Sequence, residues 1–219
     1  LNGKFDIKKL KEMVFFSAPF IMFDFSTVVL NLSDRFFIEY FLGLSKTGIY
    51  SIGFLVGSII LIVVNALINV FRPLIYEKIK NYAQEKISLR KFSIQYLTTL
   101  LVTTIFLVFV LKKIIFIYFI DAKFFASQEI VWTIAFGFFF WGLYCLYISY
   151  FIFEKQTKTI FTVSILSILF NLTLNYIMIP KFGTIGAGYA TLATYFFGGI
   201  TVYLLFIFKL KPQLLIKYK

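Results

Sequence analysis

The feature that most constrains this chain is a series of long apolar runs separated by short charged clusters. Of its 219 residues, 60% are hydrophobic and only 15% are charged, whereas a soluble domain is about a quarter charged. A helix of about 20 residues is long enough to cross a hydrocarbon core of about 30 Å. The sequence therefore predicts an all-α membrane protein with a bundle of six transmembrane helices. The predicted spans are residues 13–33, 48–71, 92–111, 129–153, 159–179 and 188–208.

Lysine and arginine are distributed unevenly between the connections of these spans. Sixteen lie on the side of the N-terminus and six on the other side. Because connections rich in lysine and arginine stay in the cytoplasm, we expect both termini there. We assign residues 1–12 to a cytoplasmic link, 13–209 to a transmembrane lobe and 210–219 to a basic cytoplasmic tail. The polar segment 72–91 is expected to be a cytoplasmic loop with a short surface helix.

The composition also limits the chemistry of the chain. There is no histidine, and the single cysteine, Cys145, lies inside an apolar run. A disulfide within the chain and a Cys/His metal site are therefore excluded. The net charge of +12 is explained by basic residues that lie beside anionic lipid, so nucleic acid is not an expected partner. We predict no catalytic residue, no metal and no cofactor.

Glycine spacing predicts two close approaches of the backbone. Gly53 and Gly57 form a GxxxG pattern, which lets a neighbouring helix pack closely. The glycines of "KFGTIGAG" at 181–188 lack the Gly-Lys-Ser/Thr that ends a phosphate-binding loop. This segment is therefore predicted to be a tight turn between two spans.

Polar residues recur on one face of three spans, at the spacing of a helix. Such a face either bonds to a neighbouring helix or lines a wet cavity, because lipid offers polar side chains no partner. For the fifth span we favour bonds between helices, and for the first two we favour a cavity. The stripes are Ser17, Asp24, Thr27, Asn31 and Asp34 in the first span; Ser51, Ser58, Asn65, Asn69 and Arg72 in the second; and Ser164, Ser167, Asn171 and Asn175 in the fifth.

Ionisable residues on these stripes are the first candidates for function. Asp24 lies in the middle of its span, where a carboxylate is either a proton, cation or substrate site or a structural hydrogen-bond partner. Arg35 and Arg72 end the first two stripes at opposite membrane faces, and a guanidinium can hold phosphate with two hydrogen bonds. The alternative is that both arginines simply extend to the membrane surface. The charge count places Asp34 and Arg35 in an outer hairpin, where both charges can reach water and each other.

Three segments resemble a known family. They are "NLSDRFFIEYFLGLSKTGIYSIGFLVGSII" at 31–60, "KFDIKKLKEMVFFSAPF" at 4–20 and "NLTLNYIMIPKFGTIGAGYATLATY" at 171–195. They are similar to the first hairpin, the cytoplasmic link and the last hairpin of the C-terminal lobe of Wzx-type polysaccharide (O-antigen) flippases. These flippases belong to the multidrug/oligosaccharidyl-lipid/polysaccharide exporter superfamily.

The resemblance implies a place in a larger transporter. The full protein would have twelve helices in two six-helix lobes, so a missing N-terminal lobe is an expected partner. Its cargo would be an undecaprenyl-pyrophosphate-linked oligosaccharide, moved to the outer leaflet of a bacterial inner membrane by alternating access coupled to an ion gradient. Bilayer lipids and a polysaccharide polymerase are further expected partners.

The hypothesis for the site follows from the stripes and the resemblance together. Asn31, Asn65, Asn69 and Thr27 are expected to meet sugar hydroxyls, Arg35 and Arg72 to attract the pyrophosphate, and Asp24 to couple ion binding to transport. Three alternatives stay open: a cation-coupled multidrug exporter of the same superfamily, a membrane-embedded glycosyl- or acyltransferase, and an assembly protein that only binds partners.

Overall fold

A computed structural model describes residues 7–218, which are helical almost throughout and contain no strand in that range. Within α1 several side chains, those of Ser17 and Asp24 among them, lie outside the described part. The elements are α1 Ile7–Leu42, α2 Leu44–Gly57, α3 Ile59–Lys78, η1 Ile79–Asn81, α4 Tyr82–Phe106, η2 Leu107–Leu111, α5 Lys112–Tyr118, η3 Ala122–Ser127, α6 Gln128–Phe153, α7 Thr157–Phe182, α8 Thr184–Leu205, η4 Phe206–Leu210 and α9 Lys211–Lys217. The segments η1 and η3 are 3₁₀ turns, whereas η2 and η4 are π turns.

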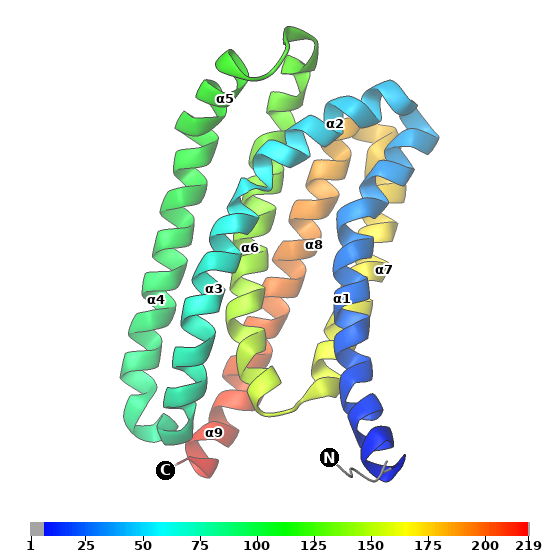
Figure 1. Cartoon of the computed structure of the whole chain (residues 1–219). Coiled ribbons are helices and arrows are strands. Elements are labelled where there is room, and N and C mark those ends of the chain that lie inside the picture. Colours follow the sequence, from blue (N-terminus) through cyan, green and yellow to red (C-terminus); the bar gives the residue numbers. More distant parts are fainter. Residues whose placement is uncertain (1–6, 219) are drawn as a thin grey trace, which may run out of the picture.

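Long apolar helices run side by side along one axis (Figure 1). Four stretches of the described chain are long and apolar enough to cross a membrane: Leu44–Tyr118, Ala122–Phe153, Thr157–Phe182 and Thr184–Lys217. The first of them reverses direction at η1, so that α3 and α4 lie antiparallel (Figure 1). An all-helical chain with such helices fits a membrane protein, and the number of six spans remains a prediction.

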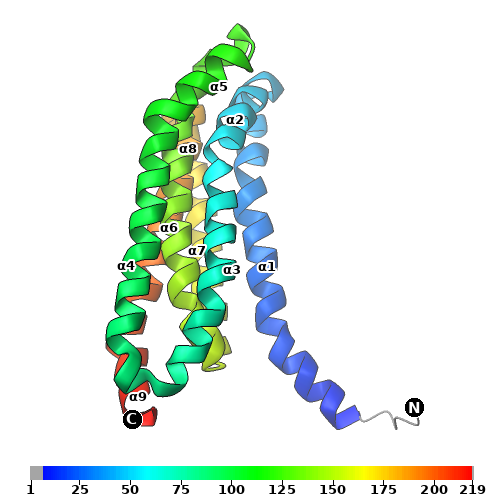
Figure 2. The same ribbon diagram turned by 60° about the vertical axis from the view of Figure 1, so that its left-hand side comes forward.

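The centre of the bundle is α6. In the most apolar window of the stretch Ala122–Phe153, 72% of the residues are buried, against 33–39% in the other three stretches. This helix packs against α2, α3, α4 and α8, while α7 packs between α1 and α8. Figure 2 shows the lower part of α1 diverging from α3, and α1 packs mainly against α2, α7 and α8. One side of α1 and one side of α3 are thus left uncovered.

The polar segment 72–91 differs from the predicted loop. α3 continues to Lys78 and α4 begins at Tyr82, so the chain reverses within the three residues of η1. An ion pair of 2.9 Å between Lys78 Nζ and Glu85 Oε2 joins the two helices across this turn. The start of α1 and the short α9 lie at the same end of the bundle (Figure 1).

Two glycines make the tightest turns between helices. Gly43 separates α1 from α2 with φ of 85°, and Gly183 separates α7 from α8 with φ of 65°. Residues that carry a side chain rarely adopt such positive φ angles, whereas glycine does so freely. The predicted turn in residues 181–188 is therefore confirmed, and it consists of a single residue between two helices.

The predicted close packing at Gly53 and Gly57 is also confirmed. Both glycines of α2 lie against α6 and the η3 turn that precedes it. A Cβ built at Gly57 would be 2.7 Å from the Cβ of Ile134 in α6, and one at Gly53 would be 2.6 Å from the carbonyl oxygen of Ser127 in η3. Real Cβ atoms do not approach so closely, so even an alanine would force the helices apart.

We therefore expect Gly57→Ala to lower the free energy of unfolding by about 1–3 kcal/mol, the usual cost of an overpacked contact. Thermal unfolding of the purified protein in detergent measures this change. Gly48→Ala is the matched control in the same helix, because a Cβ there has no neighbour within 4 Å. Equal stability of the two variants would contradict the close packing of α2 on α6.

Candidate functional site

The best-defined polar site is built around the carboxylate of Asp34 in α1. The side chain is fully buried, at 0% exposure. Its Oδ2 accepts hydrogen bonds from Tyr50 Oη of α2 and from Thr191 Oγ1 of α8, the latter at 2.7 Å. Its Oδ1 accepts a bond of 2.7 Å from Asn175 Nδ2 of α7. These four residues, which we call the Asp34 node, join four helices.

Amide side chains of α7 extend the Asp34 node along the bundle. Asn171 Oδ1 accepts bonds from Ser33 Oγ at 2.8 Å and from Asn175 Nδ2 at 3.0 Å. Asn171 Nδ2 donates to Thr194 Oγ1 of α8 at 3.3 Å. The buried Oδ1 of Asn175 accepts no hydrogen bond within residues 7–218, so the network retains one acceptor without a donor.

No cationic side chain of the described chain forms an ion pair with Asp34. The neighbouring Arg35 turns elsewhere: its Nε donates to Ser51 Oγ at 3.2 Å and its Nη1 to the Asn31 carbonyl at 2.6 Å. Its guanidinium carbon lies 4.7 Å from the centre of the Phe54 ring, a cation–π arrangement. The carboxylate is thus held by neutral donors alone.

This geometry suits an ionised carboxylate, which only accepts hydrogen bonds and here faces three donors. A buried charge is costly even when donors surround it. A proton or a small monovalent cation at the carboxylate would neutralise Asp34. Oxygen atoms are the ligands that hard cations prefer. Chemically, the Asp34 node can therefore take up a proton or a small cation.

The structure corrects the prediction that Asp34 and Arg35 reach water and each other. Asp34 is buried and makes no ion pair with Arg35 within the described range. The physical reason is that α1 does not stop near residue 33 but continues to Leu42. The pair consequently lies inside a helix, where adjacent side chains point about 100° apart. One of them faces the core and the other faces α2.

The predicted cargo residues of α1 form a second group close to the Asp34 node. Asn31 and Thr27 are half-buried, and Asn31 Nδ2 donates to the carbonyl oxygen of Thr27 at 2.6 Å. Asn31 Oδ1 accepts a bond of 3.3 Å from Tyr195 Oη of α8. Together with Arg35, these side chains are tied to α2 and α8. The predicted ion-coupling residue Asp24 belongs to α1, but its side chain lies outside the described residues.

The predicted cargo residues of α3 lie apart from this group. Asn65 and Asn69 are exposed on one face, one turn apart, and Arg72 is half-buried, with its Nε 3.3 Å from Ser149 Oγ of α6. Pro73 lies inside the helix and has no N–H to donate to the carbonyl of Asn69, four residues earlier. No hydrogen bond in the described part connects the α3 group to the α1 group.

The predicted bonds from the fifth stripe to other helices are confirmed at its two asparagines. Its four residues Ser164, Ser167, Asn171 and Asn175 are buried, and the two asparagines bond to α1 and α8. Sequence reasoning missed Tyr50 and Thr191 as partners of Asp34. The sequence pattern did place Asp34 on the same polar stripe as Asn31. Its burial was not predicted, because the residue was assigned to an outer hairpin at the end of the helix.

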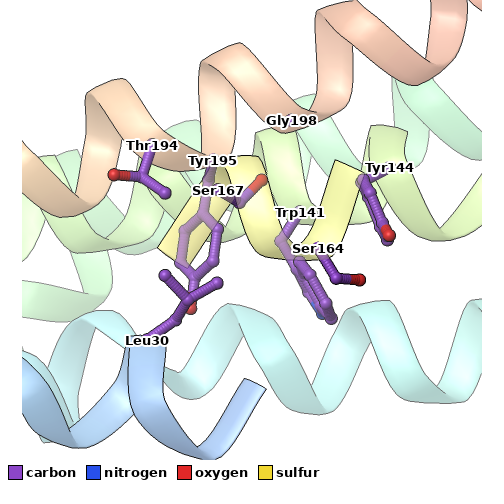
Figure 3. Close-up of a pocket in the computed structure, with 8 residues that line it drawn as sticks. All are labelled: Leu30, Trp141, Tyr144, Ser164, Ser167, Thr194, Tyr195 and Gly198. Carbon is purple, nitrogen blue, oxygen red and sulfur yellow. The ribbon is translucent and has the colours of Figure 1, made fainter. Parts of the chain in front are cut away.

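A small pocket lies between α1, α6, α7 and α8 (Figure 3), and one of the residues that line it is Thr194, the partner of Asn171. The space open to the centre of a water molecule is about 10 Å³, roughly enough for one water. Trp141 and Tyr144 stack with ring centroids 5.0 Å apart, and Tyr195 points from α8 toward Leu30 of α1 (Figure 3). The pocket thus has room for a single water beside Thr194.

Comparisons with known proteins do not identify a family. No protein-family model matches the chain, and no curated protein sequence is significantly similar to it. The resemblance to flippases therefore remains a hypothesis from the sequence, and the functional proposal depends on the residues themselves.

We expect Asp34→Ala to lower the free energy of unfolding by several kcal/mol. The change leaves the hydroxyls of Tyr50 and Thr191 and one N–H of Asn175 buried without their acceptor, at about 1–3 kcal/mol for each unsatisfied group. Thermal unfolding in detergent measures the loss. Glu39→Ala is the matched control, because Glu39 is an exposed acid on the same helix.

A double-mutant cycle separates the bond from a general loss of packing. Thr191→Val and Asp34→Ala remove the same hydrogen bond, so their combined effect should be smaller than the sum of the single effects. Strict additivity would show that the two side chains do not interact.

Proposed function

We propose that this chain is one lobe of an ion-coupled membrane transporter. The membrane-crossing units would be α1, α2 with α3, α4 with α5, α6, α7 and α8. The apolar stretches and the reversals at η1 and Gly183 support this arrangement. The excess of lysine and arginine at the end that carries α9 favours a cytoplasmic location for that end.

The observation that carries the proposal is the Asp34 node. A carboxylate buried among apolar helices without a cationic partner is a functional candidate by default. Here its three donors come from α2, α7 and α8, so neutralising Asp34 would weaken the bonds that hold α1 to three other helices. Uptake of a proton or a monovalent cation would then change the position of α1, one side of which is not covered by another helix.

The proposed cargo is a lipid-linked oligosaccharide with a pyrophosphate group. The exposed amides of Asn65 and Asn69 support it, because side-chain amides both donate and accept hydrogen bonds with sugar hydroxyls. A helix face with such groups requires water, cargo or another protein surface in place of lipid. Arg72, one turn further on, could hold the pyrophosphate, while Arg35 would first have to leave Ser51 and Asn31.

We expect Asp34→Asn to remove the dependence of transport on an imposed ion gradient. The amide keeps the shape of the carboxylate but can neither bind a proton at neutral pH nor supply a charge to a cation. Transport of a lipid-linked oligosaccharide into proteoliposomes, with a sodium or proton gradient, measures this change. Gradient-driven transport should fall at least tenfold, while exchange without a gradient continues.

Two further variants decide between coupling residues. Glu39→Gln removes an exposed acid from the same helix and should transport as the wild type does. Asp24→Asn tests the residue predicted from the sequence. Coupling lost in Asp24→Asn but retained in Asp34→Asn would overturn the assignment to Asp34. Export of an organic cation in place of the oligosaccharide would favour the multidrug exporter.

We also expect Asn65→Leu together with Asn69→Leu to reduce transport at least tenfold without lowering thermal stability, because both side chains are exposed and leucine is a good helix former. Complementation of a flippase-deficient bacterial strain provides the assay. Gln95→Leu with Thr99→Leu is the matched control, an exposed polar pair with the same spacing on α4. Full activity of the double variant Arg35→Ala, Arg72→Ala would show that neither arginine is needed to bind the pyrophosphate.

A further inference from the structure

A large groove lies on another side of the bundle from the Asp34 node. It is formed by α4, α6, α8, η4 and α9, and the space within it open to the centre of a water molecule is about 820 Å³. Figure 1 draws α4 and α1 on opposite sides of the molecule, and none of the groove residues belongs to the Asp34 node or to the cargo residues proposed above. The groove is therefore separate from the site and the cargo residues described above.

One end of the groove is strongly basic. Lys86 and Arg90 of α4 and Lys211 of α9 line it, and all three are exposed. None of them belongs to an ion pair in the described range, and no acidic residue lines the groove. Three uncompensated cations at one mouth favour an anionic group with several acceptor oxygens.

Apart from Ser93, the remainder of the groove is lined by apolar and aromatic residues. Leu97, Leu143 and Ile200 form its walls, and the rings of Tyr147 and Tyr203 lie 4.9 Å apart between these walls and the basic end. From Lys86 to Leu97 the helical rise is about 16 Å, which is about half of a 30 Å hydrocarbon core. The groove thus has the depth of one leaflet, with its charges at the surface end.

We propose that this groove binds one anionic phospholipid from the leaflet at the basic end of the bundle. The phosphate lies among Lys86, Arg90 and Lys211, and an acyl chain follows the apolar wall toward the middle of the membrane. This inference depends on the proposed membrane crossing but not on the cargo or on ion coupling. A failed transport assay would therefore leave it intact.

Lipid binding to the purified protein tests the proposal directly. Native mass spectrometry after titration with phosphatidylglycerol or phosphatidylcholine gives the affinity for each lipid. We expect phosphatidylglycerol to bind at least tenfold more tightly. The triple variant Lys86→Gln, Arg90→Gln, Lys211→Gln should lose this preference. The control variant Lys80→Gln, Lys91→Gln, Lys209→Gln changes the net charge equally at exposed positions outside the groove and should keep it.

The other outcomes overturn the proposal. If both triple variants lost the preference for phosphatidylglycerol equally, the preference would come from the net positive charge of the protein and not from the groove. If the wild type bound the two lipids equally, the groove would accept acyl chains without recognising the headgroup. Competition by soluble glycerol phosphate at the same concentration would mean that the phosphate alone is recognised. A dimer that buries the groove would identify a second copy as its occupant.

A measurement on the unmodified protein guards against variants that fail to fold. In nanodiscs, phosphatidylglycerol should protect Lys86 and Lys211 from acetylation relative to phosphatidylcholine, while Lys80, Lys91 and Lys209 react equally in both. Uniform reactivity of all five lysines in the two lipids would contradict a bound headgroup.

Discussion

The arrangement of this bundle depends on how a single carboxylate obtains its hydrogen bonds. Asp34 lies in the interior of α1, where the backbone N–H groups are already engaged within the helix. A carboxylate only accepts, so its own helix cannot satisfy it. The donors come instead from Tyr50, Asn175 and Thr191 on three other helices. The positions of α2, α7 and α8 relative to α1 are thereby tied to one side chain.

Some hydroxyl groups elsewhere in the bundle obtain their hydrogen bonds within their own helix. Thr104 of α4 and Thr173 of α7 donate to the carbonyl oxygen four residues earlier in their own helices. Such bonds satisfy the hydroxyl without a partner helix, so they place no constraint on packing. Contacts between helices are then determined by shape, as at α2 and α6, where Gly53 and Gly57 admit the neighbouring backbone. Polar bonding and close packing thus specify different pairs of helices.

Much of the local structure was predictable, whereas the centre of the site was not. Apolar run length predicted the long helices, and the spacing of Asn171 and Asn175 predicted their bonds to other helices. The burial of Asp34 was missed because two of its partners are 141 and 157 residues away in the chain. No local pattern marks Thr191 as a donor to α1. The exposure of Asn65 and Asn69 was likewise not predictable, because it depends on which face of α3 has no helix packed against it.

The π turn at Phe206–Leu210 gives the end of α8 a particular role. A π turn accommodates one residue more than an α-helical turn, which rotates everything after it by about 100° compared with an uninterrupted helix. The register of α9, and with it the direction of Lys211, is thus determined by this single irregular turn. Deleting one residue from this turn would keep the lysines of the tail but would turn Lys211 away from Lys86 and Arg90. Helical phase therefore determines which positive charges meet at this surface, independently of their number.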